Sequence, residues 1–171
     1  EDGTIPPMAK RLGSERVRVF PTALEGRGFL FDSFRERKLL DYYLEPAALK
    51  NGLSLSEARL LLYLRQSAPC TRRELVDFTG LSRSGLTMLL NRLEGKGLAF
   101  ITEISPSKEK KGGEKRLEIT FPPSADPTLE DLENAWEDFS AARLSGFTPE
   151  ERERYEALSE RIQENIRSLL Q

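Results

Sequence analysis

The sequence predicts a mainly α-helical protein with one small β-hairpin. Most segments carry apolar residues at the three- and four-residue spacing of amphipathic helices, and glycine or proline separates these segments. The exception is a pair of short apolar segments, residues 98–104 and 115–121, joined by a polar stretch that contains Gly112 and Gly113. Such a pair is typical of a β-hairpin. The 171 residues suffice for one domain with helical extensions.

The composition argues against a membrane protein, a disulfide scaffold and an enzyme. No run of about 18 apolar residues occurs, and the first residues lack a signal pattern, so we expect a cytoplasmic protein. A single cysteine, Cys70, excludes an internal disulfide and fits a reducing compartment. The chain has no histidine, no glycine-rich phosphate loop and no cysteine pair. We therefore expect no catalytic residue, no cofactor and no metal site.

Charge is distributed unevenly along the chain. Residues 71–121 hold ten Lys or Arg against seven Asp or Glu, whereas residues 122–171 hold five against twelve. A basic middle and an acidic end indicate that only the middle contacts a polyanion, although solvated helix faces give the same pattern.

The first half of the chain predicts a loose arm and two helices. Residues 1–22 are interrupted by Pro and Gly without periodicity, which is typical of a flexible arm. Residues 28–49 are helix-like, with an interruption or bend expected at Pro46. After a turn at Asn51-Gly52, a third segment begins near a capping Ser54 or Ser56, and the helix that follows carries Leu60, Leu61, Leu62 and Leu64.

Residues 71–97 predict two short helices separated by a tight turn. Thr71 and Glu74 have the spacing of a capping box, and Gly80 can end the first helix in a left-handed conformation. Ser82 can cap the second helix, which ends at Gly95 and Gly97. Its inward stripe is Leu86, Leu89, Leu90 and Leu93. The opposite face carries Ser84, Met88 and Asn91, flanked by Thr87 and Arg92.

The order of these elements is that of a winged helix-turn-helix. The first short helix braces the second, the second presents its N-terminus and its uncluttered face to a DNA major groove, and the basic hairpin forms the wing. The last third predicts two further helices, from about residue 128 to 144 and from residue 149 onward. Thr148, Pro149 and Glu151 form the start of the final helix, and its apolar stripe requires a partner helix.

From about residue 24 onward the chain resembles the multiple-antibiotic-resistance regulator (MarR) family. The resemblance rests on "GLSLSEARLLLYL", on "TRRELVDFTGLSRSGLTMLLNRLEGKGL", on the hairpin end "LEIT" and on "LSGFTPEERERYEALSERIQENI". It implies a homodimer that holds two winged helices over a pseudo-palindromic operator. It also implies a small phenolic or lipophilic effector that binds near the junction of the two parts and lowers DNA affinity.

With the resemblance, the chain divides into four parts. These are a flexible arm (residues 1–22), an N-terminal dimerisation helix (23–50), a winged helix-turn-helix DNA-binding domain (51–122) and C-terminal dimerisation helices (123–171). We expect a sequence-specific transcriptional regulator of double-stranded DNA, and a repressor rather than an activator. The alternatives are a protein-interaction module and a small-molecule-binding protein with little DNA affinity.

The expected DNA contacts come from both helices and the wing. The family's wing usually carries Asp-x-Arg before its closing Leu-Thr, but here Lys111, Gly112 and Gly113 stand at that distance from Ile119-Thr120. Lysines therefore take over phosphate contact. The predicted DNA-binding residues are Thr71, Ser82, Arg83, Ser84, Thr87, Asn91, Arg92, Lys110, Lys111, Lys115 and Arg116. Helix N-termini offer N–H groups to phosphate, and many such hydrogen bonds go to phosphate rather than to bases.

Two further groups of side chains admit more than one role. Phe34, Tyr42, Tyr43 and Trp136 are candidates for an effector pocket, but aromatic residues at helical spacing more often form a core or a dimer interface. Cys70 admits a redox-sensing role because some relatives switch by cysteine oxidation. Only Arg72 and Arg73 lie near it in the sequence to lower its pKa, so we expect an ordinary thiol.

Overall fold

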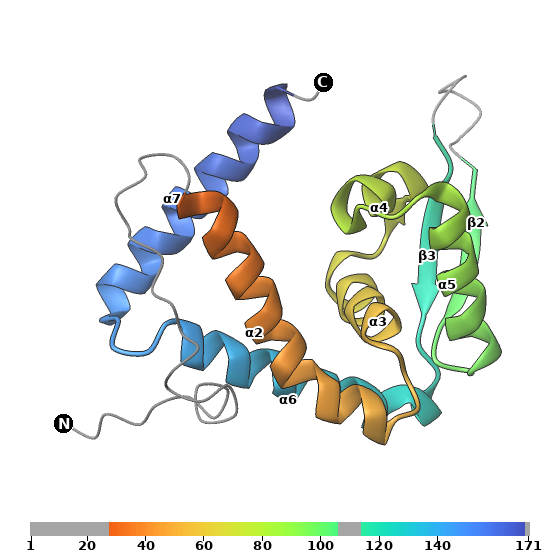
Figure 1. Cartoon of the computed structure of the whole chain (residues 1–171). Coiled ribbons are helices and arrows are strands. Elements are labelled where there is room, and N and C mark those ends of the chain that lie inside the picture. Colours follow the sequence, from red (N-terminus) through yellow and green to blue (C-terminus); the bar gives the residue numbers. More distant parts are fainter. Residues whose placement is uncertain (1–27, 106–113, 170–171) are drawn as a thin grey trace.

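The computed structural model describes residues 28–105 and 114–169, with side chains from residue 32 onward. It consists of two parts (Figure 1). One is a compact winged helix, made of three helices and a small sheet. The other is a set of three longer helices, α2 (Gly28–Lys50), α6 (Asp126–Arg143) and α7 (Pro149–Leu169), of which α2 and α6 cross beside the winged helix (Figure 1). None of the described helices is long and apolar enough to cross a membrane.

Helix α2 (Gly28–Lys50) runs without interruption through Pro46, so the predicted interruption is wrong, and the alternative of a bend stays a prediction. Proline removes one hydrogen bond of the helix, but packing on either side of it holds the helix together. Leu44 and Ala48 are fully buried on the same face, two residues before and after Pro46. They belong to the core where α2 packs against α6 (Asp126–Arg143).

Polar contacts fix the crossing of α2 and α6 at one end. The Asp131 carboxylate of α6 accepts hydrogen bonds from Lys50 and from the Asn51 side-chain amide, at 3.0 and 2.9 Å. Thr128 donates to the Asn51 side-chain oxygen over 2.8 Å. The turn after α2 is therefore attached to the start of α6, next to the short 3-10 helix Pro123–Ala125.

The three helices of the winged helix begin at the predicted caps. Helix α3 (Leu55–Ser67) starts at Ser54, helix α4 (Arg72–Thr79) starts at Thr71, and both have complete capping boxes. Helix α5 (Arg83–Gly95) starts at Ser82, whose side chain accepts a hydrogen bond from the Gly85 N–H. Gly80, with φ of +67°, makes the left-handed turn between α4 and α5, which glycine adopts without steric cost.

The sheet has three antiparallel strands, one more than the sequence predicts. Its order is β1 (Cys70–Thr71), β3 (Arg116–Thr120), β2 (Phe100–Ile104). The expected hairpin forms between β2 and β3, with Ile101 opposite Ile119. The added strand β1 contains only two residues, and it attaches the start of α4 to β3 through the pairs Cys70–Leu117 and Thr71–Arg116.

Leucines from four elements form the centre of the winged helix. Those with no more than 2% exposure include Leu60, Leu61 and Leu64 of α3, Leu75 of α4, Leu86, Leu90 and Leu93 of α5, and Leu117 of β3. The stripe predicted for α5 is thus buried in full, because Leu89 is only 5% exposed. This burial directs the opposite side of α5 outward.

Helix α7 (Pro149–Leu169) has the predicted start but no core of its own. Thr148 and Glu151 exchange the two hydrogen bonds of a capping box, at 2.8 and 3.2 Å. None of its described side chains is buried, and Leu158, Ile162 and Ile166 are 40–54% exposed. The part of the chain that the structure describes therefore provides no neighbour that covers this apolar stripe.

Candidate nucleic-acid interface

The outward face of α5 presents the predicted side chains together. Arg83, Ser84, Thr87, Met88, Asn91 and Arg92 line one shallow, open concavity on the surface. All six are exposed, because the leucine stripe occupies the other side of the helix. Among the described residues, neither the Arg83 nor the Arg92 guanidinium has a salt-bridge partner within 4.0 Å. Both charges are therefore available to a polyanion.

The hydroxyl groups at the two helix starts already serve as caps. The Thr71 side chain accepts from the Glu74 N–H at 3.1 Å, and the Ser82 side chain accepts from the Gly85 N–H at 3.1 Å. The Ser82 and Ser84 hydroxyls also lie 3.2 Å apart. A Cβ at Gly85 would approach the Ser82 hydroxyl to 3.1 Å, so glycine leaves this first turn open.

Arg72 occupies a bridging position that the sequence did not indicate. Its Nε donates to Glu103 of β2 over 3.0 Å, and its Nη1 donates to the Thr87 hydroxyl of α5 over 3.3 Å. Thr87 in turn donates to the Arg83 carbonyl over 3.0 Å. The guanidinium therefore connects the wing to the outward face of α5. Its hydrogen bond, with the nearby positive charges, lowers the pKa of Glu103.

The base of the wing carries two of the predicted basic residues. Lys115 and Arg116 are exposed, and the Lys115 ammonium lies 3.7 Å from the Glu103 carboxylate. Arg116 begins β3, opposite Ile104 and Thr71. Lys110 and Lys111 lie outside the described residues. The predicted DNA contacts of the wing thus remain predictions.

A cavity of about 610 Å³ lies between α2, α6 and the winged helix. Of the four residues predicted for an effector pocket, only Trp136 lines it. Phe34, Tyr42 and Tyr43 are not among its lining residues. Tyr43 packs edge-to-face against Phe139 with ring centroids 6.5 Å apart, which places it in the contact between α2 and α6.

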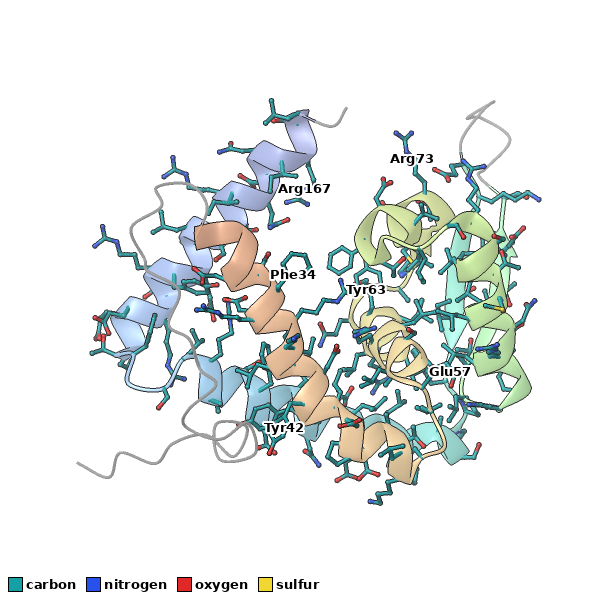
Figure 2. The ribbon with its side chains drawn as sticks, viewed as in Figure 1. Phe34, Tyr42, Glu57, Tyr63, Arg73 and Arg167 are labelled. Atoms are coloured by element: carbon teal, nitrogen blue, oxygen red, sulfur yellow. The ribbon has the colours of Figure 1, made fainter. Side chains whose placement is uncertain are left out.

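Two aromatic residues that the sequence did not suggest form another wall of the cavity. Tyr63 of α3 and Phe78 of α4 stack with ring centroids 4.1 Å apart, and both line the cavity. Figure 2 shows Tyr63 and Phe34 on the two sides of the space between α2 and the winged helix. Phe78 is 70% exposed, so its ring is accessible from the cavity. Burial raises the pKa of Tyr63, which keeps its hydroxyl neutral.

Charged side chains line other parts of the cavity. Arg59 pairs with Asp41, and Arg143 pairs with Glu36 at 3.4 Å and also contacts the Tyr155 ring. Arg37 also lines the cavity. The cavity therefore combines an aromatic wall with several guanidinium groups. This combination suits a small aromatic ligand that also carries polar groups.

Cys70 lies inside the fold rather than on a reactive surface. Its side chain is 3% exposed, and burial, together with the charge of Glu74, raises the pKa of its thiol. A thiol with a raised pKa is a poor nucleophile. Among the described residues, no group of three or more Cys, Asp or Glu side chains is arranged to hold a metal ion.

Comparisons with known proteins agree with this architecture. Residues 51–107 match the family model described as "MarR family". The fold is similar to that of transcriptional regulator PA3341, with 25% identity, a TM-score of 0.63, and coverage of 85% of this chain and 99% of that chain. No match was found among curated proteins.

Two further solved structures share the fold at 17% identity. One is a putative MarR family transcriptional regulator from Listeria monocytogenes complexed with 26mer DNA, with a TM-score of 0.58 over 82% of this chain and 87% of that one. The other is BpsR from Bordetella bronchiseptica, whose DNA binding is regulated by 6-hydroxynicotinic acid, with a TM-score of 0.57 over 84% and 96%. The winged helix matches the MarR family model, and the fold as a whole is similar to that of solved transcriptional regulators.

Proposed function

We propose that the protein is a sequence-specific transcriptional regulator that binds double-stranded DNA as a homodimer. The observation that carries the proposal is the outward face of α5, where exposed polar side chains lie on a well-packed helix together with two guanidinium groups that have no salt-bridge partner among the described residues. Such a helix fits a major groove, whose base edges offer hydrogen-bond partners to Arg, Asn, Ser and Thr. The DNA complex of the similar Listeria protein supports this assignment.

The homodimer rests on the exposed stripe of α7. Leu158, Ile162 and Ile166 form a long apolar face that none of the described residues covers. We assign this face to contacts with a second copy of the chain. The dimer then carries two α5 helices, one from each copy. A two-fold dimer recognises a pseudo-palindromic operator, because the symmetry of the protein matches that of the DNA.

Repression is the mode that we assign to this dimer. A dimer that covers an operator excludes other proteins from the same DNA and needs no additional contact surface to do so. We also propose that the protein is bacterial and binds its DNA in the cytoplasm.

The effector is assigned to the cavity between α2, α6 and the winged helix. The volume of about 610 Å³ falls in the range of small-molecule sites. Phe78, Thr79 and Leu81 line it and belong to the end of α4 and the turn before α5. A phenolic or lipophilic ligand in this cavity would contact the turn that orients α5, and so lower DNA affinity. The regulation of BpsR by 6-hydroxynicotinic acid supports a ligand of this kind.

Titration with duplex DNA at several salt concentrations tests the proposal. Because each neutralised phosphate releases condensed counterions, the logarithm of the binding constant should fall with the logarithm of salt concentration, with a slope of roughly several units. A protein that binds no duplex even at low salt would instead be a protein-interaction or small-molecule-binding module.

A further inference from the structure

Glu103 of β2 lies at a junction of four elements. Its carboxylate accepts a hydrogen bond from Arg72 of α4 over 3.0 Å and lies 3.7 Å from the Lys115 ammonium, next to β3. Arg72 also donates to Thr87 of α5 over 3.3 Å. One carboxylate therefore links both strands of the wing to the first helix of the helix-turn-helix and, through Arg72, to the second.

Among the described residues, one other hydrogen bond involving a side chain joins the wing to α5. Near the base of β2, the Ile101 N–H donates to the Glu94 carboxylate over 2.9 Å. The pairing of β1 with β3 also attaches the hairpin to the start of α4, but it does not reach the outward face of α5. The Glu103–Arg72 contact, farther along β2, adds a side-chain attachment that continues through Arg72 to Thr87 on the outward face of α5.

The relative orientation of α5 and the wing matters for recognition because both must meet one duplex at the same time. Contacts to phosphate set the register of a protein on DNA, and contacts to bases read the sequence only in the correct register. Thr87 is itself on the outward face of α5, so the junction also fixes one of the proposed recognition side chains. A carboxylate beside this surface repels phosphate, and that effect acts on every duplex equally.

We propose that Glu103 is a positioning residue for DNA recognition: through Arg72 it holds the wing and the Thr87-bearing face of α5 in one orientation, and it raises sequence preference without touching DNA. The inference rests on the proposed DNA-binding function. It makes Arg72 a bridge between protein elements in the free protein, in addition to any phosphate that it meets on DNA.

Glu118 offers a matched control. It lies on the neighbouring strand, opposite Thr102, is exposed, and makes no described hydrogen bond or salt bridge. Glu118→Gln removes the same charge from the wing as Glu103→Gln but leaves the junction intact. A third variant, Glu103→Asp, keeps the charge and shortens the reach to Arg72 by one methylene group.

The experiment first selects a preferred duplex from a random-sequence library with the wild-type protein. Binding constants are then measured by fluorescence anisotropy for the selected duplex and for a random one, and circular dichroism confirms that each variant is folded. We expect Glu103→Gln and Glu103→Asp to lower the preference for the selected duplex by roughly fivefold or more. Glu118→Gln should change the preference by no more than about twofold relative to wild type. It should slightly raise the affinity for both duplexes, and equally, because one repulsive charge has been removed.

Failure of the inference and failure of the proposed DNA-binding function give different results. Equal preferences for the Glu103→Gln and Glu118→Gln variants would show that Glu103 acts only through its charge and would overturn the inference. A Glu103→Asp variant with wild-type preference would overturn it as well. If the wild-type protein selects no duplex and binds none at low salt, the proposed function fails, and the inference fails with it.

Discussion

Lys96, at the end of α5, donates a hydrogen bond to the Glu57 carboxylate of α3 over 2.7 Å. The same ammonium donates to the Gly52 carbonyl over 2.7 Å, and Glu57 also accepts the Ser54 N–H of its own capping box over 3.0 Å. Glu57 is 3% exposed. The pair therefore ties the C-terminal end of the proposed recognition helix to the core helix beneath it.

The first prediction concerns this pair and pH. Burial by itself raises the pKa of Glu57, but the hydrogen bonds from Lys96 and Ser54, with the charges of Lys96 and Arg92, lower it overall. A lowered pKa means that the ionised carboxylate stabilises the fold above the ordinary value of 4.5, and that this contribution disappears as pH falls through the folded-state pKa.

Glu57→Gln should therefore lower the free energy of unfolding at pH 7 by about 1–3 kcal/mol. The difference from wild type should shrink as the pH falls from 4.5 through the lowered folded-state pKa of Glu57, because the folded wild-type carboxylate then becomes protonated. Urea unfolding at several pH values measures both quantities. A difference that stays constant down to pH 3 would show that the charge of Glu57 contributes nothing.

Cys70 gives the second prediction. Because burial and Glu74 raise the pKa of its thiol, the reactive thiolate is scarce at neutral pH. At pH 8, iodoacetamide should label the native protein at roughly one tenth of the rate for the urea-unfolded protein, or at a still lower rate. Equal rates in the two states would mean that the thiol is accessible and would contradict the expectation of an inert thiol.

The third prediction concerns the dimer. Ile162→Glu places a charge in the middle of the exposed stripe of α7, where the side chain is 54% exposed in the single chain. We expect monomers by light scattering and a large loss of DNA affinity, because a buried unpaired charge disrupts an apolar interface. Gln163→Glu adds the same charge at the next position and should remain dimeric. Two variants that are both dimeric would remove α7 from the interface.

The fourth prediction concerns the cavity. Phe78→Ala removes the ring that stacks on Tyr63 but that is otherwise 70% exposed, so the free energy of unfolding should fall by only about 1 kcal/mol. A phenolic compound that raises the melting temperature of the wild-type protein should lose that effect in this variant. Phe100→Ala is the control, since Phe100 is also exposed but lies on β2 and does not line the cavity. Equal ligand effects in the two variants would place the ligand elsewhere.

Local features of this fold could be predicted from the sequence, and non-local ones could not. The capping boxes at Thr71 and Thr148 involve residues three apart, and the stripe of α5 repeats within one helix, so the sequence shows both directly. Strand β1 contains two residues and exists only because β3 lies beside it. No pattern along the chain signals such a pairing.

The same distinction holds within the candidate site. The outward face of α5 follows from helical spacing, and the structure brings its predicted residues together. The Arg72–Glu103 contact joins residues of separate elements, and the stack of Phe78 on Tyr63 depends on how α3 and α4 pack. The predicted interruption at Pro46 was wrong because the sequence shows the hydrogen bond that proline removes. It does not show the tertiary burial of Leu44 and Ala48, which holds the helix together.

One measurement tests most directly whether the outward face of α5 reads DNA sequence. It compares how strongly the Arg83→Ala and Arg92→Ala variants prefer the selected duplex over a random one. Both guanidinium groups are exposed and unpaired among the described residues, but Arg83 begins the helix and Arg92 lies near its end. We predict that Arg83→Ala loses about 1–3 kcal/mol on the selected duplex and much less on the random one, as for a base contact. Arg92→Ala should weaken both equally, as for a phosphate contact. If Arg83→Ala binds both duplexes as the wild type does, the face of α5 does not read DNA, and the account is contradicted.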